Sequence, residues 1–189
     1  MLSRAATMTG SATAGSSAVT DRMTAIYQAE GQRLAGLGRL LTGSIEEGED
    51  AAHEVFVRAL TVSQDNPEYL QDPVWPWLRT ALVRLVIQRR RSMIRERRRL
   101  ARFFRPTDER PWPAETADVA AALRALSPRM RACAVLHHCE DLTVAQTADV
   151  VGCSPATALV HLREARSRLR GLLGDEPAVS ANPRSSTHG

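Results

Sequence analysis

Arginine side chains crowd the segment 89–105 and make it a candidate site for binding a polyanion. Glu96 is the single acid there, among nine arginines. At about 100° per residue, arginines this dense cannot share one face of a helix, so they would surround it with positive charge. A merely solvated helix normally interleaves acids that pair with basic residues at i,i+4 spacing. The pattern therefore predicts a segment that binds a polyanion or an acidic protein surface.

Residues 143–173 are a second candidate, because they have the signals of a helix-turn-helix. Thr143 and Gln146 fit a capping box at the start of the first helix. Gly152 ends that helix, since glycine accepts the left-handed conformation common at helix ends. Ser154-Pro155 then begins a second helix with a capping hydroxyl and a proline at the first position. One apolar stripe follows at helical spacing, formed by Ala158, Leu162, Ala165, Leu169 and Leu172.

The other side of this second helix contains Arg163, Arg166 and Arg170. A helix of this length and charge is suited to the major groove of DNA, where the second helix of such a motif reads base edges. An ordinary helical hairpin is the alternative interpretation, because alanine, glycine and arginine are common in helical proteins of any kind.

The remaining reactive side chains do not predict catalysis or metal binding. Cys133 and His137 are one helical turn apart, but His138 and Cys139 point elsewhere, whereas a structural zinc site needs four convergent ligands. We expect Cys133 to be a core residue. The sequence contains no evident pair of pocket carboxylates, no nucleophile elbow and no phosphate-binding loop. We therefore expect no catalytic residue, no metal and no cofactor.

The elements that position these residues are predicted to be helices. Hydrophobic residues make up 43% of the 189 residues but aromatic residues only 4%, which favours an all-α fold over a β-sandwich or barrel. All 25 basic residues are arginine, for which a GC-rich genome is the simplest explanation, and the net charge is +4. Three cysteines without a CxxC pair, no apolar run of membrane-spanning length and no signal core predict a cytoplasmic protein.

We predict two small helical domains joined by a flexible linker. The first would contain helices at 21–41, at 44–63 and from Trp77 onward, and the second would contain the helix-turn-helix. Proline and a reversal of charge mark the linker, and small polar residues mark both ends of the chain. The predicted boundaries are a disordered tail at 1–20, a first domain at 21–104, a linker at 105–117, a second domain at 118–173 and a disordered tail at 174–189.

This order of features resembles the extracytoplasmic-function group of bacterial sigma-70-type factors, which keep the second and fourth conserved regions of larger sigma factors. The region 2 signature acid-x-x-Gln-Glu-x-Phe appears at residues 50–56, followed by the pair Trp77-Leu78. The region 4 pattern Leu-x-x-Leu-x-Pro-x-x-Arg appears at residues 123–131, and Ser-x-x-Thr at residues 154–157. Each motif is weak alone, but their order and spacing together are a strong signal. The resemblance covers nearly the whole chain outside the tails and the linker.

The resemblance implies three binding surfaces. Core RNA polymerase would dock on Asp50, His53, Glu54 and Phe56, although Phe56 could equally belong to the core. The minus-ten element would contact Trp75, Arg79, Arg84, Gln88, Arg89, Arg91 and Arg95. The minus-thirty-five element would contact Ser154, Pro155, Ala156, Thr157, Val160, His161, Arg163 and Arg166. Of the tryptophans before the basic helix, we expect Trp77 to be largely core and Trp75 more exposed.

Several residues depart from the family pattern. His53 replaces the usual glutamine, and Gln146 replaces the usual glutamate of the helix-turn-helix. Four further departures touch the presumed promoter-reading surfaces, namely Arg84 for asparagine, Gln88 for aspartate, and Leu159 and His161 for lysine and arginine. We therefore expect an atypical promoter rather than that of relatives.

The resemblance predicts an alternative sigma factor that binds core RNA polymerase and promoter DNA, with an anti-sigma factor as a possible further partner. Three alternatives remain open from the sequence. One is a degenerate sigma-like protein that binds polymerase without reading promoters. The others are a conventional helix-turn-helix regulator and an arginine-rich RNA-binding protein.

Overall fold

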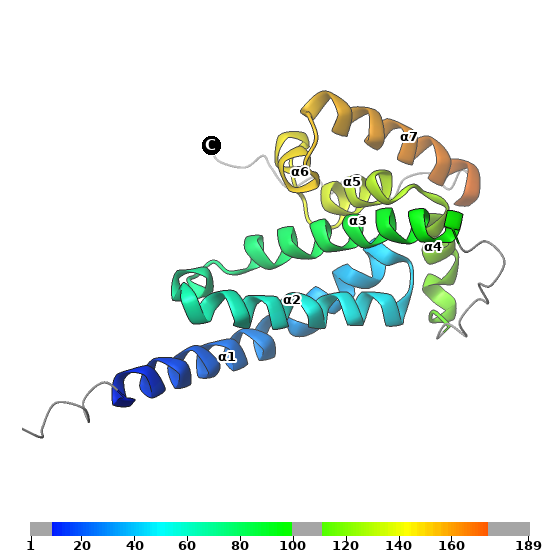
Figure 1. The fold of residues 1–189 in the computed structure, drawn as a ribbon. Coiled ribbons are helices and arrows are strands. Elements are labelled where there is room, and N and C mark those ends of the chain that lie inside the picture. Colours follow the sequence, from blue (N-terminus) through cyan, green and yellow to red (C-terminus); the bar gives the residue numbers. More distant parts are fainter. Residues whose placement is uncertain (1–8, 100–110, 174–189) are drawn as a thin grey trace, which may run out of the picture.

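A computed structural model describes residues 9–99 and 111–173, with side chains described at 17–90 and 111–173 apart from 65, 67 and 69. Every secondary-structure element within these ranges is a helix, as the composition predicted. The elements are α1 (Thr9–Thr42), α2 (Ile45–Asp65), a short 3-10 helix η1 (Pro67–Leu70), α3 (Trp75–Arg99), α4 (Ala114–Ala125), α5 (Pro128–His138), α6 (Val144–Val151) and α7 (Pro155–Leu173). Figure 1 shows α1, α2 and α3 stacked as one half of the molecule, with α5, α6 and α7 lying across α3.

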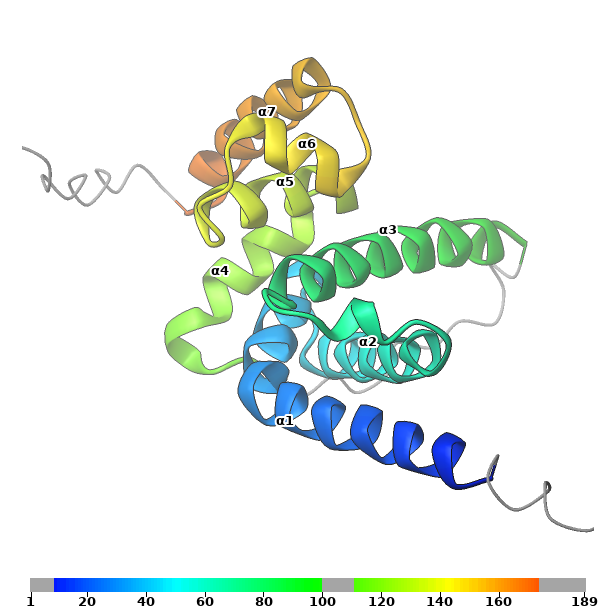
Figure 2. The same cartoon turned by 90° about the vertical axis from the view of Figure 1, so that its left-hand side faces the viewer.

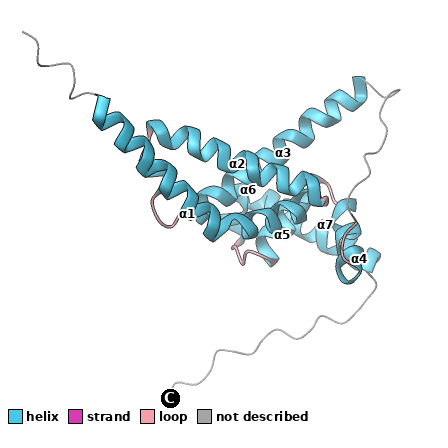
Figure 3. Cartoon of the chain, turned by 90° about the horizontal axis from the view of Figure 1, so that it is seen from below, coloured by secondary structure: helices cyan, strands magenta, loops and turns pink. Residues whose placement is uncertain are grey.

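Helices α1 and α2 form a hairpin (Figure 3). Gly38 of α1 and Gly48 of α2 face each other across it, which lets the two backbones approach closely. A Cβ atom added to Gly38 would lie 2.4 Å from the Gly48 carbonyl oxygen, so no larger residue fits there without separating the helices. Gly43 makes the turn with φ 79°, and Ser44 caps α2 by accepting a hydrogen bond from the Glu47 N–H at 3.4 Å. The predicted start of this helix at Ser44 is therefore confirmed.

Aliphatic residues build the core of the first half, as the small aromatic content required. Helix α3 contributes the fully buried Leu78 and Leu82, which join residues of α1 and α2 in one cluster. The largest fully buried side chains in this half are Leu34, Val55, Leu78, Leu82 and Val83.

The second half confirms the predicted helix-turn-helix. Thr143 and Gln146 form the reciprocal capping box of α6, and Gly152 ends that helix in the left-handed conformation with φ 73°. Helix α5 begins at the predicted Ser127-Pro128 and is buried along most of its length. It packs against α6 and α7, and α4 packs against α7. In Figure 2, α6 and α7 lie on one side of α5 and α4 on the other.

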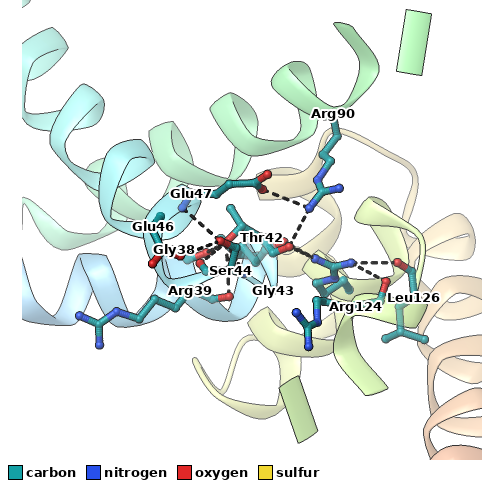
Figure 4. Close-up of polar contacts among 12 residues, drawn as sticks. Gly38, Arg39, Thr42, Gly43, Ser44, Glu46, Glu47, Arg90, Arg124 and Leu126 are labelled. Carbon is teal, nitrogen blue, oxygen red and sulfur yellow. Dashed lines mark hydrogen bonds and ion pairs between the residues drawn. The ribbon is translucent and has the colours of Figure 1, made fainter. Parts of the chain in front are cut away.

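The two halves are in contact through the end of α1. The Arg131 guanidinium, on α5, donates to the carbonyl oxygens of Leu41 and Thr42 in the first half. Figure 4 shows the Thr42 region, where Arg90 of α3 also donates to the Thr42 carbonyl at 2.9 Å. The Trp112 indole adds a bond to the Gly43 carbonyl at 3.2 Å.

Two boundaries differ from the sequence prediction. Helix α1 begins at Thr9, inside the segment that we expected to be a disordered tail, and Val19 is buried against the core. Helix α4 begins at Ala114, within the expected linker. The predicted C-terminal tail at 174–189 and residues 105–110 of the predicted linker lie outside the described residues. None of the helices in the described part of the chain is long and apolar enough to span a membrane.

Candidate nucleic-acid interface

The first turn of α7 is accessible to solvent. Ser154 caps the helix, with its hydroxyl accepting a hydrogen bond from the Thr157 N–H at 3.1 Å. Pro155 and Ala156 are exposed, and Thr157 is half-buried. The orientation of α7 is fixed by a buried stripe on its inner side, formed by Ala158, Leu162 and Ala165.

The outer face of α7 presents the exposed aliphatic residues Leu159 and Val160 followed by arginines. Val160 is 49% exposed, and Arg163 and Arg166 are both exposed. An open hollow runs along this face, lined by Arg163, Arg166, Ser167, Arg170 and Gly171. His161 differs from the rest of the predicted set, because it is half-buried and its Nδ1 is buried without a hydrogen-bond partner among the described residues.

The acidic group on α2 divides between the surface and internal contacts. Asp50 and His53 are exposed, as a docking surface requires. Glu54 instead bridges to Arg58 on its own helix and to Arg89 on α3. Burial acts to raise the pKa of Glu54, but the Arg89 and Arg58 guanidiniums outweigh it and hold the pKa below its usual value. Glu54 therefore joins α2 to α3, a role that the sequence did not reveal.

Phe56 is 6% exposed, so its side chain is a core residue and adds little area to a surface. It packs edge-on against Tyr27 of α1, with ring centroids 4.9 Å apart. Tyr27 is 47% exposed, and its hydroxyl lies 3.2 Å from His53 Nε2. Together with Arg39 and Glu49, these residues line a groove of about 450 Å³ between α1 and α2. Tyr27 thus supplies the exposed aromatic surface that was expected of Phe56.

The two tryptophans at the start of α3 have the opposite exposure to the one predicted. Trp75 is 8% exposed, whereas Trp77 is half-buried and packs against the edge of the core. Trp75 is covered because its indole donates to Glu140 at 2.8 Å and the Arg33 guanidinium lies 3.7 Å above its ring. Both contacts come from segments distant in sequence, so helix periodicity alone could not predict them.

The predicted minus-ten residues on α3 lie in different environments. Arg84 and Gln88 are exposed and one turn apart, and they form the accessible part of the set. The Arg79 side chain is only 13% exposed, and its Nη1 lies 3.5 Å from Glu140 Oε2. Arg89 is paired with Glu54. Arg91 and Arg95 belong to α3, but their side chains lie outside the described residues.

The sequence of the second half matches a family model. Residues 116–169 match the family described as sigma-70, region 4. These residues form a sigma-70 region 4 domain. The helix-turn-helix of α6 and α7 belongs to this domain, and the resemblance predicted from the motifs is confirmed.

Solved structures of similar fold extend the comparison to the first half. The sigma factor RpoE in complex with the anti-sigma factor NepR, from Bartonella quintana, matches with a TM-score of 0.65 and 22% identity, over 82% of this chain and 98% of that chain. CnrH in complex with the cytosolic domain of CnrY matches with a TM-score of 0.57 and 23% identity, over 88% of this chain and 96% of that chain. No curated protein sequence matches the chain. The chain therefore has the fold of these proteins over both halves.

Arg131 and Glu140 of the region 4 domain make polar contacts with the first half, and sequence reasoning assigned these contacts to neither. Arg131 belongs to the matched region 4 pattern, but its bonds to the end of α1 became visible only in the structure. Glu140 lies in the turn between α5 and α6 and contacts Trp75, Arg79 and Arg33. No local pattern marks Glu140, because acidic residues after a helix end, such as Glu140 and Asp141, are commonly solvated.

The cysteine and histidine group of the region 4 domain does not converge. Cys133 is fully buried, and burial raises the pKa of its thiol to about 12. His137 Nδ1 lies 2.6 Å from the Leu142 carbonyl oxygen, which fixes its ring within the α5–α6 turn. Among the described residues, no three metal-ligating side chains gather at one point. Cys133 is therefore a core residue, as predicted.

Proposed function

We propose that the chain is a sigma factor of the extracytoplasmic-function type, which binds core RNA polymerase and directs it to a set of promoters. One observation carries the proposal: a sigma-70 region 4 domain presents the start of α7 and an arginine face to solvent. A fold shared with the sigma factor RpoE over 82% of the chain supports it. The chain would bind polymerase and promoter DNA in the cytoplasm.

The exposed start of α7 would enter the major groove at the minus-thirty-five element. Pro155, Ala156 and Thr157 are small, so base reading there would depend on van der Waals contact and few hydrogen bonds. Arg163 and Arg166 would contact phosphates, which position a helix on DNA without specifying sequence. On α3, Arg84 and Gln88 are the accessible residues for the minus-ten element, and their chemistry predicts an atypical element.

The docking surface for polymerase would be the outer face of α2 with the neighbouring part of α1. Asp50 has no ion-pair partner among the described residues, so its carboxylate can meet a basic residue of the polymerase. His53 and Tyr27 would add polar and aromatic contacts beside it. Because Glu54 already pairs with Arg58 and Arg89, its main contribution would be to hold α2 in place.

Run-off transcription with purified core polymerase tests this function. The wild-type chain should start transcripts from a subset of a randomised promoter library, and Asp50→Arg should weaken binding to core polymerase at least tenfold. Asp118→Arg is the matched control, because Asp118 is exposed on α4, in the other half of the chain. Both variants must keep the helical circular dichroism of the wild type.

The same experiment separates the alternatives. Binding to polymerase without any transcript would identify a degenerate sigma-like protein. Sequence-specific binding to duplex DNA without polymerase would identify a conventional regulator, and preference for RNA would identify an RNA-binding protein. By analogy with RpoE bound to NepR, an inhibitory protein partner is part of the proposal, and added partner should abolish the transcripts.

A further inference from the structure

The Glu140 carboxylate of the region 4 domain is inserted into a site built by the first half of the chain. Its Oε2 accepts a hydrogen bond from the Trp75 indole N–H at 2.8 Å. The same oxygen lies 3.5 Å from Arg79 Nη1 and 3.5 Å from Arg33 Nη2. Only 10% of the Glu140 side chain remains exposed. One buried anion is therefore held by two cations and one neutral donor.

The turn between α5 and α6 presents Glu140 to this site. Asp141 adopts a left-handed conformation with φ 51°, which aspartate tolerates better than most residues. The Leu142 N–H returns to the Leu136 carbonyl oxygen at 3.1 Å and closes the turn. Glu140 precedes the reversal and lies against α1 and α3.

The receiving site is suited to a phosphate. Indole and guanidinium N–H groups that converge on one oxygen bind phosphate oxygens as readily as a carboxylate. Glu140 also leaves the site incompletely paired, because Arg79 Nε is buried and has no acceptor among the described residues. The guanidiniums of Arg33 and Arg79 both face the Glu140 carboxylate, and Arg33 also lies 3.9 Å from Glu30. A phosphodiester of nucleic acid could take the place of the Glu140 carboxylate between the two guanidiniums.

We propose that Arg33, Trp75 and Arg79 form a binding site for a DNA backbone phosphate, which Glu140 fills while the two halves are packed together. The identity of the phosphate as part of DNA rests on the proposed function. DNA and the region 4 domain then compete for one site, so the packed chain binds DNA more weakly than an opened chain. Glu140 acts as an internal substitute for the phosphate.

The test compares Glu140→Gln with the wild-type chain in binding a short fluorescein-labelled DNA duplex of mixed sequence. Glutamine keeps the shape of the side chain and an oxygen for the Trp75 indole, so the substitution removes mainly the charge. We expect affinity to rise about fivefold or more and the salt dependence to steepen by about one unit. Asp118→Asn is the control, because it removes the same charge from an exposed position of the same half. A rise no larger than that of the control would overturn the proposal.

A double-mutant cycle assigns the gain to the site. Arg33 retains 53% of its side-chain exposure, so Arg33→Gln should fold normally, which circular dichroism checks. It should change DNA binding little in the wild-type background but remove most of the gain in the Glu140→Gln background. An undiminished gain in the double variant would show that DNA does not use this site.

Hydrogen exchange without DNA distinguishes failure of this inference from failure of the proposed function. Glu140→Gln should speed exchange in the α5–α6 turn and at the start of α3, because the contact between the halves is weakened. Faster exchange with no gain in DNA affinity would refute the phosphate site and leave the proposed function to the transcription experiment. If the double-mutant cycle gives the expected changes in DNA affinity but the wild-type chain starts no transcript, the result would support the site and contradict the proposed function.

Discussion

Arg131 offers the sharpest test of how the two halves are held together. Its guanidinium is 3% exposed and donates to four backbone carbonyl oxygens. Two of these, from Leu41 and Thr42, lie at the end of α1, and the other two, from Arg124 and Leu126, lie at the end of α4. Carbonyls in the last turn of a helix have no partner within that helix, so one side chain satisfies two helix ends. Its positive charge also suits both helix dipoles.

We predict that Arg131→Met lowers the free energy of unfolding by about 3 kcal/mol. The Thr42 carbonyl would keep its bond from Arg90, which leaves three carbonyls without their side-chain donor. A buried acceptor without a partner costs roughly 1 kcal/mol at the lower end of the measured range. Burial and the nearby Arg90 lower the pKa of Arg131 to about 10, so the guanidinium is charged at neutral pH and its bonds are charge-assisted.

Urea unfolding followed by far-ultraviolet circular dichroism measures this effect. Arg168→Met is the control, because Arg168 is exposed on α7, and it should change the unfolding free energy by less than about 0.5 kcal/mol. Arg131→Lys should recover less than half of the loss, since an ammonium cannot span four carbonyls as a planar guanidinium does. A loss below about 1 kcal/mol for Arg131→Met, with an unchanged denaturant slope, would refute the reasoning.

Three further predictions concern the surface residues and Glu54. Arg163→Ala should weaken binding to all promoters similarly and reduce the salt slope by about one unit, whereas altered promoter preference with the slope intact would mean that Arg163 reads a base. Arg84→Asn combined with Gln88→Asp should shift promoter choice in run-off transcription from a randomised library, and identical promoter sets would exclude this face from sequence reading. Because its folded-state pKa is lowered, Glu54 stabilises the fold above its unfolded-state pKa, a benefit lost as pH falls through the lower folded-state value. The stability gap between wild type and Glu54→Gln, measured by urea unfolding, should therefore shrink below about pH 4.5, and a constant gap down to pH 2 would contradict this.

The sequence by itself determined the helices and those of their ends that have capping signals, because these depend on neighbouring residues. Capping at Ser44, Ser127 and Thr143 and the left-handed turn at Gly152 all follow from local hydrogen bonding and backbone sterics. The apolar stripe of α7 predicted its inner face, and the exposed arginines opposite followed from it. The helix-turn-helix and the resemblance to sigma-70-type factors were within reach for this reason.

The tertiary structure alone decided which of the candidate binding residues named from the sequence remain accessible to solvent. Periodicity tells which residues share a face, but a second element can cover that face from any distance along the chain. Trp75 is buried because Glu140 and Arg33 cover it. Glu140 lies 65 residues later in the sequence, and Arg33 lies on α1. Phe56 lies beneath Tyr27, and Glu54 is drawn to Arg89 across α3. Each of these outcomes depends on long-range packing, for which the sequence contains no local signal.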